Sequence, residues 1–160
     1  KYWFAYNDNI ANIQTFGRLY TWYAVTDATK ISPHGWHVPD DNEWMILQFM
    51  LGMNFSELDL ECDVNNIVAG KLKETGVSHW FYPNTGATDE YFFKALPAGY
   101  RRRFDKNFEY KGEYACFWTK TEWEYDYDYA IYRHLYNNQE YICRTHNFKN
   151  YGFSVRCIKD

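Results

Sequence analysis

Hydrophobic and polar residues recur with a helical period in the first part of the chain. One helix is predicted from about Asp41 to Leu51, where apolar residues return every three or four positions. Asp40 in front of it, with Glu43 three residues further on, has the form of a capping box, and Gly52 is expected to end the helix. The side chains expected on its buried side are Trp44, Leu47, Phe49 and Leu51.

Two further segments carry weaker patterns. A shorter helix is predicted around Val68 to Thr75, ending at Gly76. The segment from Phe16 to Val25 fits a strand or a helix by pattern alone.

After Gly76, short aromatic runs alternate with Gly, Pro, Asn and Asp, which is typical of strands and turns. The predicted strands are Phe92–Leu96, Gly99–Arg103, Ala115–Thr119, Ala130–Leu135, Tyr141–Arg144 and Phe153–Ile158. Helices that come first and short strands that come later indicate an α+β fold with an antiparallel sheet.

Composition narrows the class of partner. The net charge is −4 over 160 residues, which gives no electrostatic basis for binding nucleic acid or an anionic membrane. The basic cluster Arg101, Arg102, Arg103 and Lys106 is better explained as a solvated turn between strands than as a phosphate site. The apolar run from Met45 to Met53 is too short to span a bilayer and is expected to be a core helix, so we expect no direct membrane insertion.

Candidate metal and redox chemistry is sparse. The four cysteines, Cys62, Cys116, Cys143 and Cys157, lack CxxC spacing and the histidines lack HxH or HExxH spacing, so we expect no metal and no cofactor. An even number of cysteines leaves disulfides open, and free buried thiols are the simplest interpretation of Cys116 and Cys157. Asp126 and Asp128 could bind calcium, but they are better explained as polar contact residues.

The segment from Trp123 to Tyr151 has the most unusual composition. It holds seven of the sixteen tyrosines, interleaved with Asn, Asp, His and Thr. Tyr offers a large rigid contact area at low entropic cost, and Asn and Asp add adaptable hydrogen bonds, as in antibody paratopes. This composition predicts a recognition surface.

Several phrases resemble one family across nearly the whole chain. They are GRLYTWYAV at 17–25, SPHGWHVPDDNEW at 32–44, AGKLKETG at 69–76, ATDEYFFKALPAGYR at 87–101, FWTKTE at 117–122 and GFSVRCIKD at 152–160. Together they resemble the Fibrobacter succinogenes major paralogous domain, which is similar to the formylglycine-generating-enzyme branch of the C-type lectin-like fold. The resemblance implies a single domain over 1–160, in which two helices pack on a small twisted antiparallel sheet with long loops and the termini lie close together.

The chain departs from the family pattern at Ser32, where the family commonly has Cys. The resemblance implies that such a Cys would pair with Cys157. Its absence is compatible with a reducing environment.

Domains of this kind also occur as variable proteins of diversity-generating retroelements, which alter adenines in a template of the last part of the gene. An altered AAC or AAT codon can encode Asn, Tyr, Asp, His, Ile, Thr, Ser, Cys or Phe, but not Lys, Glu, Gln, Trp or Met. The residues that fit, and that we expect to bind ligand, are Tyr125, Asp126, Tyr127, Asp128, Tyr129, Ile131, Tyr132, His134, Tyr136, Asn137, Asn138, Tyr141, Thr145, His146, Asn147, Phe148, Asn150 and Tyr151. Ile142 and Cys143 also fit.

The remaining residues of the segment 123–151 are expected to be fixed. The codon excludes Trp123, Glu124, Gln139, Glu140 and Lys149, and family spacing marks Ala130, Arg133, Leu135 and Arg144 as scaffold. Trp123 is expected to be a ligand-contacting anchor at the rim of the surface, whereas Trp118 is expected in the core. The two arginines are expected to brace the loops through backbone carbonyls.

These expectations combine into a ligand-binding domain with a hypervariable surface at 123–151, displayed on a bacterial cell or a phage particle. The expected partner is a protein or another macromolecule, with a glycan as the alternative. The sequence begins at Lys1 without a signal peptide, so any leader is expected to lie outside it. The alternative is a fixed carbohydrate-binding or adhesin domain of a secreted bacterial protein. An enzyme of the formylglycine-generating type, with Cys116 and Cys157 as a copper-binding pair, ranks third, so we expect no catalytic activity.

Overall fold

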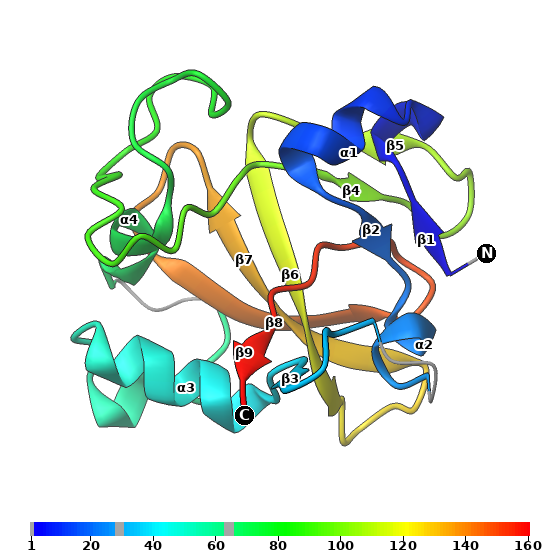
Figure 1. Ribbon diagram of the computed structural model, residues 1–160. Helices are drawn as coiled ribbons and strands as arrows, with labels where there is room; N and C mark the ends of the chain where they lie inside the picture. The colour runs from blue at the N-terminus through cyan, green and yellow to red at the C-terminus, as the bar shows by residue number, and fades with distance from the viewer. Residues whose placement is uncertain (1, 28–30, 63–65) are drawn as a thin grey trace.

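A three-stranded antiparallel sheet forms the centre of the molecule (Figure 1). The computed structural model describes residues 2–27, 31–62 and 66–160. The sheet has the order β6-β7-β8, and its strands are Tyr114–Glu122, Tyr129–Tyr136 and Ile142–Phe148. Tight turns join these strands, so they are neighbours both in sequence and in space. Their Ile, Thr and aromatic content suits a pleated surface that is packed on both sides.

The other strands form three short antiparallel ladders around this sheet. The pairs are β1 (Trp3–Phe4) with β2 (Leu19–Tyr20), β3 (Trp36–His37) with β9 (Ile158–Lys159), and β4 (Tyr100–Arg101) with β5 (Phe108–Glu109). The first and last strands therefore belong to different ladders, and Figure 1 shows the two ends of the chain well apart. The expectation that the termini lie close together is wrong.

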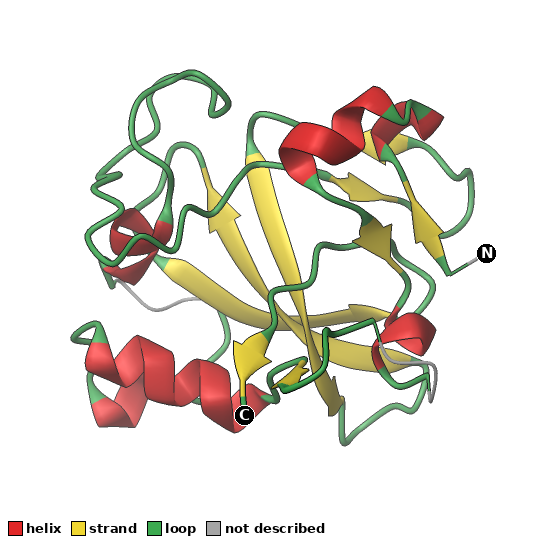
Figure 2. Cartoon of the chain, viewed as in Figure 1, coloured by secondary structure: helices red, strands yellow, loops and turns green. Residues whose placement is uncertain are grey.

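Helices are few and mostly short (Figure 2). They are α1 (Ala11–Phe16), α2 (Trp22–Val25), α3 (Asp41–Met50) and α4 (Val68–Leu72), with single 3-10 turns at η1 (Tyr6–Asp8) and η2 (Phe55–Glu57). The architecture confirms a mixed helix and strand fold with antiparallel sheets. It contains more helical segments than the expected two, because the ambiguous segment 16–25 holds both β2 and α2.

The predicted helix at 41–51 is confirmed as α3, together with its capping box. The Glu43 N–H donates to Asp40 Oδ1 at 2.9 Å, and the Asp40 N–H donates to Glu43 Oε2 at 2.8 Å. The prediction that Phe49 is buried is wrong, because its side chain is 52% exposed. The inward position is taken by Gln48, whose side chain is fully buried because it hydrogen-bonds Arg133.

Three other predicted elements need correction. The helix α4 ends at Leu72, since Lys73 is already extended. The stretch 92–96 is a loop in which Phe92 and Lys94 have φ values of 56° and 52°, which a strand does not allow. Only Ile158 of the predicted last strand lies in a strand, because residues 152–154 make isolated bridges instead. Three members of the basic cluster lie in the turn between β4 and β5 as predicted, namely Arg102, Arg103 and Lys106, whereas Arg101 lies in β4.

Two apolar clusters pack on the two sides of the central sheet. On the α3 side, Trp44 and Leu72 pack with Phe117 and Leu135. On the other side, Trp22 of α2 packs with Trp118, which is in the core as predicted. No helix in the described part of the chain is long and apolar enough to cross a membrane.

Candidate functional site

The alternation of side chains along β7 divides the segment 123–151 between two faces of the sheet. Ile131, Arg133 and Leu135 point to the α3 side, whereas Tyr132, His134 and Tyr136 point to the opposite side. Thr145 pairs with Tyr132 and Asn147 with Ala130, so β8 adds polar side chains to the same outer surface. The resulting surface, called the aromatic face below, consists of Tyr100, Tyr110, Tyr114, Tyr132, His134, Tyr136, Tyr141, Thr145, Asn147 and Tyr151.

The rings of the aromatic face form a continuous network. The His134 imidazole stacks on Tyr136 with ring centroids 4.0 Å apart, and Tyr114 meets it edge-on at 4.5 Å. Tyr110 stacks in turn on Tyr114 at 4.3 Å. Because each ring is held by at least one other ring, these side chains lose little further entropy when a ligand binds.

Burial within this network is graded. Tyr132 and His134 are each 7% exposed, so the prediction that they are surface contact residues is wrong. They form the floor of the aromatic face, because Phe153 and Trp118 pack against Tyr132. Around this floor lie half-exposed side chains, namely Tyr100, Tyr114, Tyr136, Tyr141, Thr145, Asn147 and Tyr151, and the more exposed Tyr110.

The aromatic face is electrically neutral near neutral pH. Burial lowers the pKa of His134 to about 3, so its imidazole is uncharged. Burial also raises the pKa of Tyr100, Tyr114, Tyr132 and Tyr136 above the ordinary phenol value. These groups offer hydroxyl donors and acceptors and ring surface rather than charge.

A second group of predicted residues gathers at the turn between β6 and β7. Trp123 stacks on His146 with centroids 4.2 Å apart, and Tyr129 lies 4.1 Å from the Phe148 ring. These four side chains and Tyr125 are called the hairpin-tip cluster below. Tyr125 and Tyr127 are 77% and 81% exposed, whereas Trp123, whose ring centroid lies 5.2 Å from that of Tyr125, is half-buried.

Asp126 and Asp128 shape this turn. The Asp128 N–H donates to Asp126 Oδ1 at 2.9 Å, and the Tyr129 N–H donates to the Asp126 carbonyl at 3.0 Å. Asp126 therefore serves a local turn. Across the residues that the structure describes, no group of three or more His, Cys, Asp or Glu side chains could hold a metal ion.

The predicted scaffold arginines brace the sheet against α3. The Arg133 side chain is fully buried and donates to Asp41 Oδ1 at 2.7 Å and to Gln48 Oε1 at 2.6 Å. Arg144 donates to Asp41 Oδ2 through Nη2 at 2.7 Å and through Nε at 3.0 Å. Burial alone would raise the pKa of Asp41, but the two guanidinium groups outweigh it and keep that pKa below its ordinary value.

These arginines do reach backbone carbonyls as predicted, at Asp41 for Arg133 and at Asp59 for Arg144. Their main partner is nevertheless a carboxylate, which the sequence pattern did not identify. The network joins β7, β8 and α3 through one buried charge cluster.

A buried lysine fixes the turn between β7 and β8. The Lys73 Nζ donates to the carbonyls of Thr85, Tyr136 and Gln139 at 2.8 to 2.9 Å. Burial lowers the pKa of Lys73 to about 8. Asn137 in the turn donates through Nδ2 to the Tyr82 carbonyl at 3.2 Å. The turn is therefore held in place, while Asn138 in it and Asn150 after β8 are exposed.

Other residues expected to be fixed are also enclosed. Ala130 and Leu135 are fully buried, and the Lys149 ammonium lies 3.1 Å from Glu122 and 4.5 Å from the centre of the Trp22 ring. Ile131, by contrast, was predicted to contact ligand, and that prediction is wrong. It is 4% exposed, because it points to the α3 side of the sheet.

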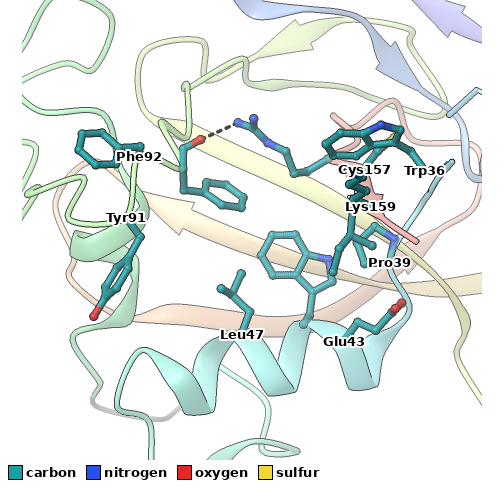
Figure 3. A pocket seen from close by; sticks show the side chains of 12 residues that line it. Trp36, Pro39, Glu43, Leu47, Tyr91, Phe92, Cys157 and Lys159 are labelled. Atoms are coloured by element: carbon teal, nitrogen blue, oxygen red, sulfur yellow. Dashed lines mark hydrogen bonds between the residues drawn. The ribbon is translucent and has the colours of Figure 1, made fainter. Parts of the chain in front are cut away.

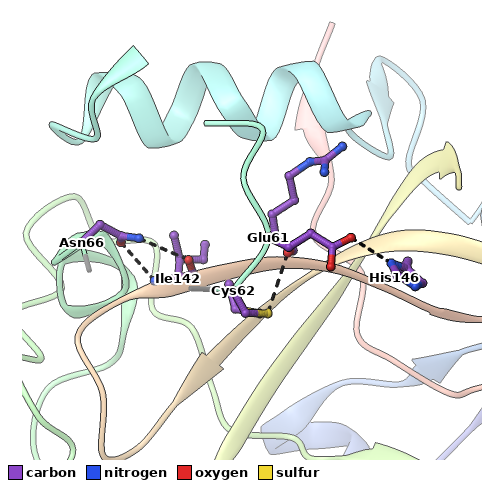
Figure 4. The surroundings of a disulfide bond; sticks show 7 residues. Glu61, Cys62, Asn66, Ile142 and His146 are labelled. Atoms are coloured by element: carbon purple, nitrogen blue, oxygen red, sulfur yellow. Dashed lines mark hydrogen bonds and ion pairs between the residues drawn. A yellow bond between two sulfur atoms is a disulfide. The ribbon is translucent and has the colours of Figure 1, made fainter. Parts of the chain in front are cut away.

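Cys143 also belongs to the frame of the fold. It forms a disulfide with Cys62, which ties the edge strand β8 to the segment that precedes α4 (Figure 4). Next to it, Asn66 accepts the Ile142 N–H at 3.1 Å, and His146 lies 3.2 Å from Glu61. Both Ile142 and Cys143 fit the codon rule, yet both are buried and structurally engaged.

The two free cysteines lie in different surroundings. Cys116 is enclosed beside Trp118, and burial raises the pKa of its thiol. Cys157 is only partly buried, which corrects the expectation for it. Together with Trp36, Glu43 and Tyr91 it lines a cleft of about 390 Å³ on the α3 side (Figure 3). Neither thiol takes part in a disulfide.

Three members of the aromatic face were missed by sequence reasoning. Tyr100, Tyr110 and Tyr114 precede the unusual segment and carry no compositional signal. Strand alternation could have placed Tyr114, because it lies two residues before Cys116 and four before Trp118, on the same face of β6.

Comparison with known proteins places the chain in a family. The chain matches no curated protein and no solved structure at a significant level. The model of the Fibrobacter succinogenes major domain, however, matches residues 1–159. The resemblance of the short phrases thus extends over the described fold, and the chain belongs to the Fibrobacter succinogenes major domain family.

Proposed function

We propose that this domain has a C-type lectin-like fold and binds a macromolecular ligand through a surface that a diversity-generating retroelement varies. The observation that supports this most is that buried and surface positions alternate within the segment 123–151. Of the residues expected to be fixed, Ala130, Arg133, Leu135 and Lys149 are enclosed, whereas Trp123, Glu124, Gln139, Glu140 and Arg144 are at least partly exposed. Most codon-compatible residues instead lie on the aromatic face or at the hairpin tip.

The binding mechanism follows from the neutrality of the aromatic face. Half-exposed tyrosine rings supply contact area, and their hydroxyls, with Thr145 and Asn147, supply hydrogen bonds. The ring network and the buried Asp41 cluster hold these groups in place before a ligand arrives. A rigid surface of this kind suits a protein or another macromolecule on a cell or phage surface.

The Cys62–Cys143 disulfide supports a location outside the cytoplasm. Disulfides persist in oxidising compartments and are rare among cytosolic proteins. This favours display at a cell surface or on a released particle over the reducing environment that the missing Cys at position 32 suggested.

The gene locus provides the test. We expect a non-coding near-repeat of the codons for 123–151 beside a reverse-transcriptase gene, with AAC or AAT opposite Tyr136, Tyr141, Thr145 and Asn147. Opposite Trp123, whose codon TGG contains no adenine, the repeat should instead match the gene. A locus without such a repeat would contradict the retroelement origin.

A fixed carbohydrate-binding domain is the second candidate, because partly exposed tyrosines such as Tyr110, which is 40% exposed, can stack on sugar rings. A glycan array with the wild-type domain and with Tyr110→Ala and Tyr136→Ala variants separates the two proposals. Binding of one glycan class that is lost in both variants favours the fixed lectin. If the wild-type domain binds no glycan on the array, a protein ligand is favoured.

A further inference from the structure

The outer side of α3 is apolar and exposed. Ile46, Phe49 and Met50 lie three or four residues apart on one helix face and are 62%, 52% and 72% exposed. Phe55 in η2 is 81% exposed. The polar groups that normally cover such a helix face are missing here, so this apolar surface requires an explanation.

These side chains border a groove of about 780 Å³ between α3 and the segment that follows it. The groove is lined by Asn42, Met45, Ile46, Phe49, Phe55, Ser56, Leu58 and Asp59. Its floor belongs to the folded core, because Leu58 is 7% exposed and Met45 packs against the core cluster. The groove is therefore part of the folded frame.

Acidic side chains predominate along the segment that forms the groove, although Lys71 Nζ binds the Leu51 carbonyl at the end of α3 and His146 lies 3.2 Å from Glu61. The sequence from 41 to 70 contains no Lys, Arg or His. Its carboxylates are Asp41, Glu43, Glu57, Asp59, Glu61 and Asp63. Asp41 and Glu43 are paired inward, with the two arginines and with His37. Asp59 is exposed on the groove lining, and the side chains of Glu57 and Glu61 reach solvent nearby in sequence. Arg144 approaches this segment, but it contacts the Asp59 carbonyl rather than the carboxylate.

We propose that this groove binds an amphipathic helix of a partner protein whose apolar stripe is flanked by lysine or arginine. The apolar floor matches the stripe, as in other helix-in-groove complexes, and the acidic border matches the flanking cations. A symmetric contact with a second copy would bring two acidic borders together, which disfavours self-association. An anionic membrane is disfavoured for the same reason.

The groove lies away from the aromatic face, which indicates what a partner bound there could do. The helix α3 packs on the side of the sheet opposite to the aromatic face, so a partner in the groove leaves the aromatic face free. The groove would attach the domain to a carrier. This inference does not depend on the proposed function, because no residue that lines the groove lies in 123–151.

The test uses two labelled, amidated model helices of about five turns. One has a leucine stripe flanked by lysine, and the other has the same stripe flanked by glutamate. Fluorescence anisotropy at low salt should show saturable binding of the lysine helix only. The variant Phe49→Ser/Phe55→Ser should weaken that binding about tenfold or more. The separate variant Asp59→Lys should also weaken binding, and its effect should be larger at low salt than at high salt.

Matched controls keep the test interpretable. Phe92→Ser removes a comparably exposed ring, 89% exposed, outside the groove and should leave binding unchanged. Tyr136→Ser should also leave it unchanged, which separates this proposal from the function of the aromatic face. Thermal melts should show every variant folded, since the altered Phe side chains are exposed.

Four results would overturn the proposal. One is equal binding, or absence of binding, of both helices. Another is helix binding that Phe49→Ser/Phe55→Ser does not change. A third is a dimer in sedimentation experiments that Phe49→Ser abolishes, because it would assign the groove to a second copy. The last is wild-type binding to phosphatidylglycerol vesicles that the same substitution removes.

Discussion

Replacing Asp41 by Asn should lower the stability of the frame that carries the aromatic face. The loss of stability should exceed that caused by removing any exposed charge. The substitution preserves shape but removes the charge shared by Arg133 and Arg144. Arg133 is fully buried, so it cannot turn to water for compensation, whereas Arg144 is partly accessible. Breaking one partner of a buried ion pair costs about 3–5 kcal/mol.

The lower end, about 3 kcal/mol, is expected, because the Asn oxygen still accepts a hydrogen bond and Gln48 remains bonded to Arg133. For a domain of this length, that corresponds to a fall in melting temperature of roughly 6–12 °C. Differential scanning calorimetry and urea denaturation at pH 7 measure both quantities. The pKa of Asp41 is lowered in the fold, so its contribution is present above the ordinary carboxyl pKa and is lost as pH falls through the folded value. The difference between variant and wild type should therefore shrink in acid.

The matched control is Glu90→Gln. Glu90 carries the same charge, but its side chain is 51% exposed and it lies 4.0 Å from Lys71. Such surface pairs contribute about 0.5 kcal/mol. If Asp41→Asn is as mild as Glu90→Gln, or if its effect does not diminish in acid, the buried cluster does not hold the sheet on α3 and this reasoning fails.

Three further predictions concern pH, redox state and ligand binding. Hydrogen bonds from the His37 imidazole to the carboxylates of Asp160 and Glu43 raise the pKa of His37, so its contribution to stability is complete below the ordinary imidazole pKa and is lost as pH rises through the folded value. His37→Gln should lower the melting temperature at pH 6 and have no effect at pH 9. Reduction of the Cys62–Cys143 disulfide, which spans 81 residues, should destabilise the domain by about 4 kcal/mol in urea titrations, and a Cys62→Ser/Cys143→Ser variant should not respond to reductant. Binding of any ligand to the aromatic face should change less than about threefold between low and high salt, because the face is neutral, and a steep salt dependence in calorimetric titrations would contradict that mechanism.

Local sequence signals predicted those elements that short-range chemistry determines. The capping box of α3 needs only Asp40 and Glu43, and both hydrogen bonds form. The strands β6, β7 and β8 follow from alternating aromatic and β-branched residues, with ends that differ from prediction by a few residues. The phrases of the family extended this to nearly the whole chain.

Contacts between residues far apart in the sequence determine the features that local patterns did not predict. Phe49 was expected in the core, but the buried position next to it is occupied by Gln48, because Arg133 from a distant strand needs an acceptor there. The segment 92–96 has a strand-like composition, yet the left-handed conformation of Phe92 prevents it from forming a strand. Neither effect is visible within a local window.

The candidate site shows the same limit. A codon rule cannot distinguish Tyr136 from Ile131, because both residues are accessible to the same altered codon. The pleat of β7 distinguishes them, since one side faces the aromatic network and the other faces α3. Cys143 likewise fits the codon rule, but its disulfide with Cys62 makes it part of the frame.

Tolerance to substitution in the segment 123–151 tests the central claim most directly, and it requires no ligand. Each position would be replaced by all residues that an altered Asn codon encodes, and the displayed library would be sorted for folded molecules by resistance to protease. We expect most replacements to be accepted at Tyr125, Tyr127, Tyr136, Thr145 and Asn147. We expect few to be accepted at Ala130, Arg133, Leu135, Cys143 and Lys149. Equal tolerance in the two groups, or greater tolerance in the second, would contradict a substitutable surface on a fixed frame.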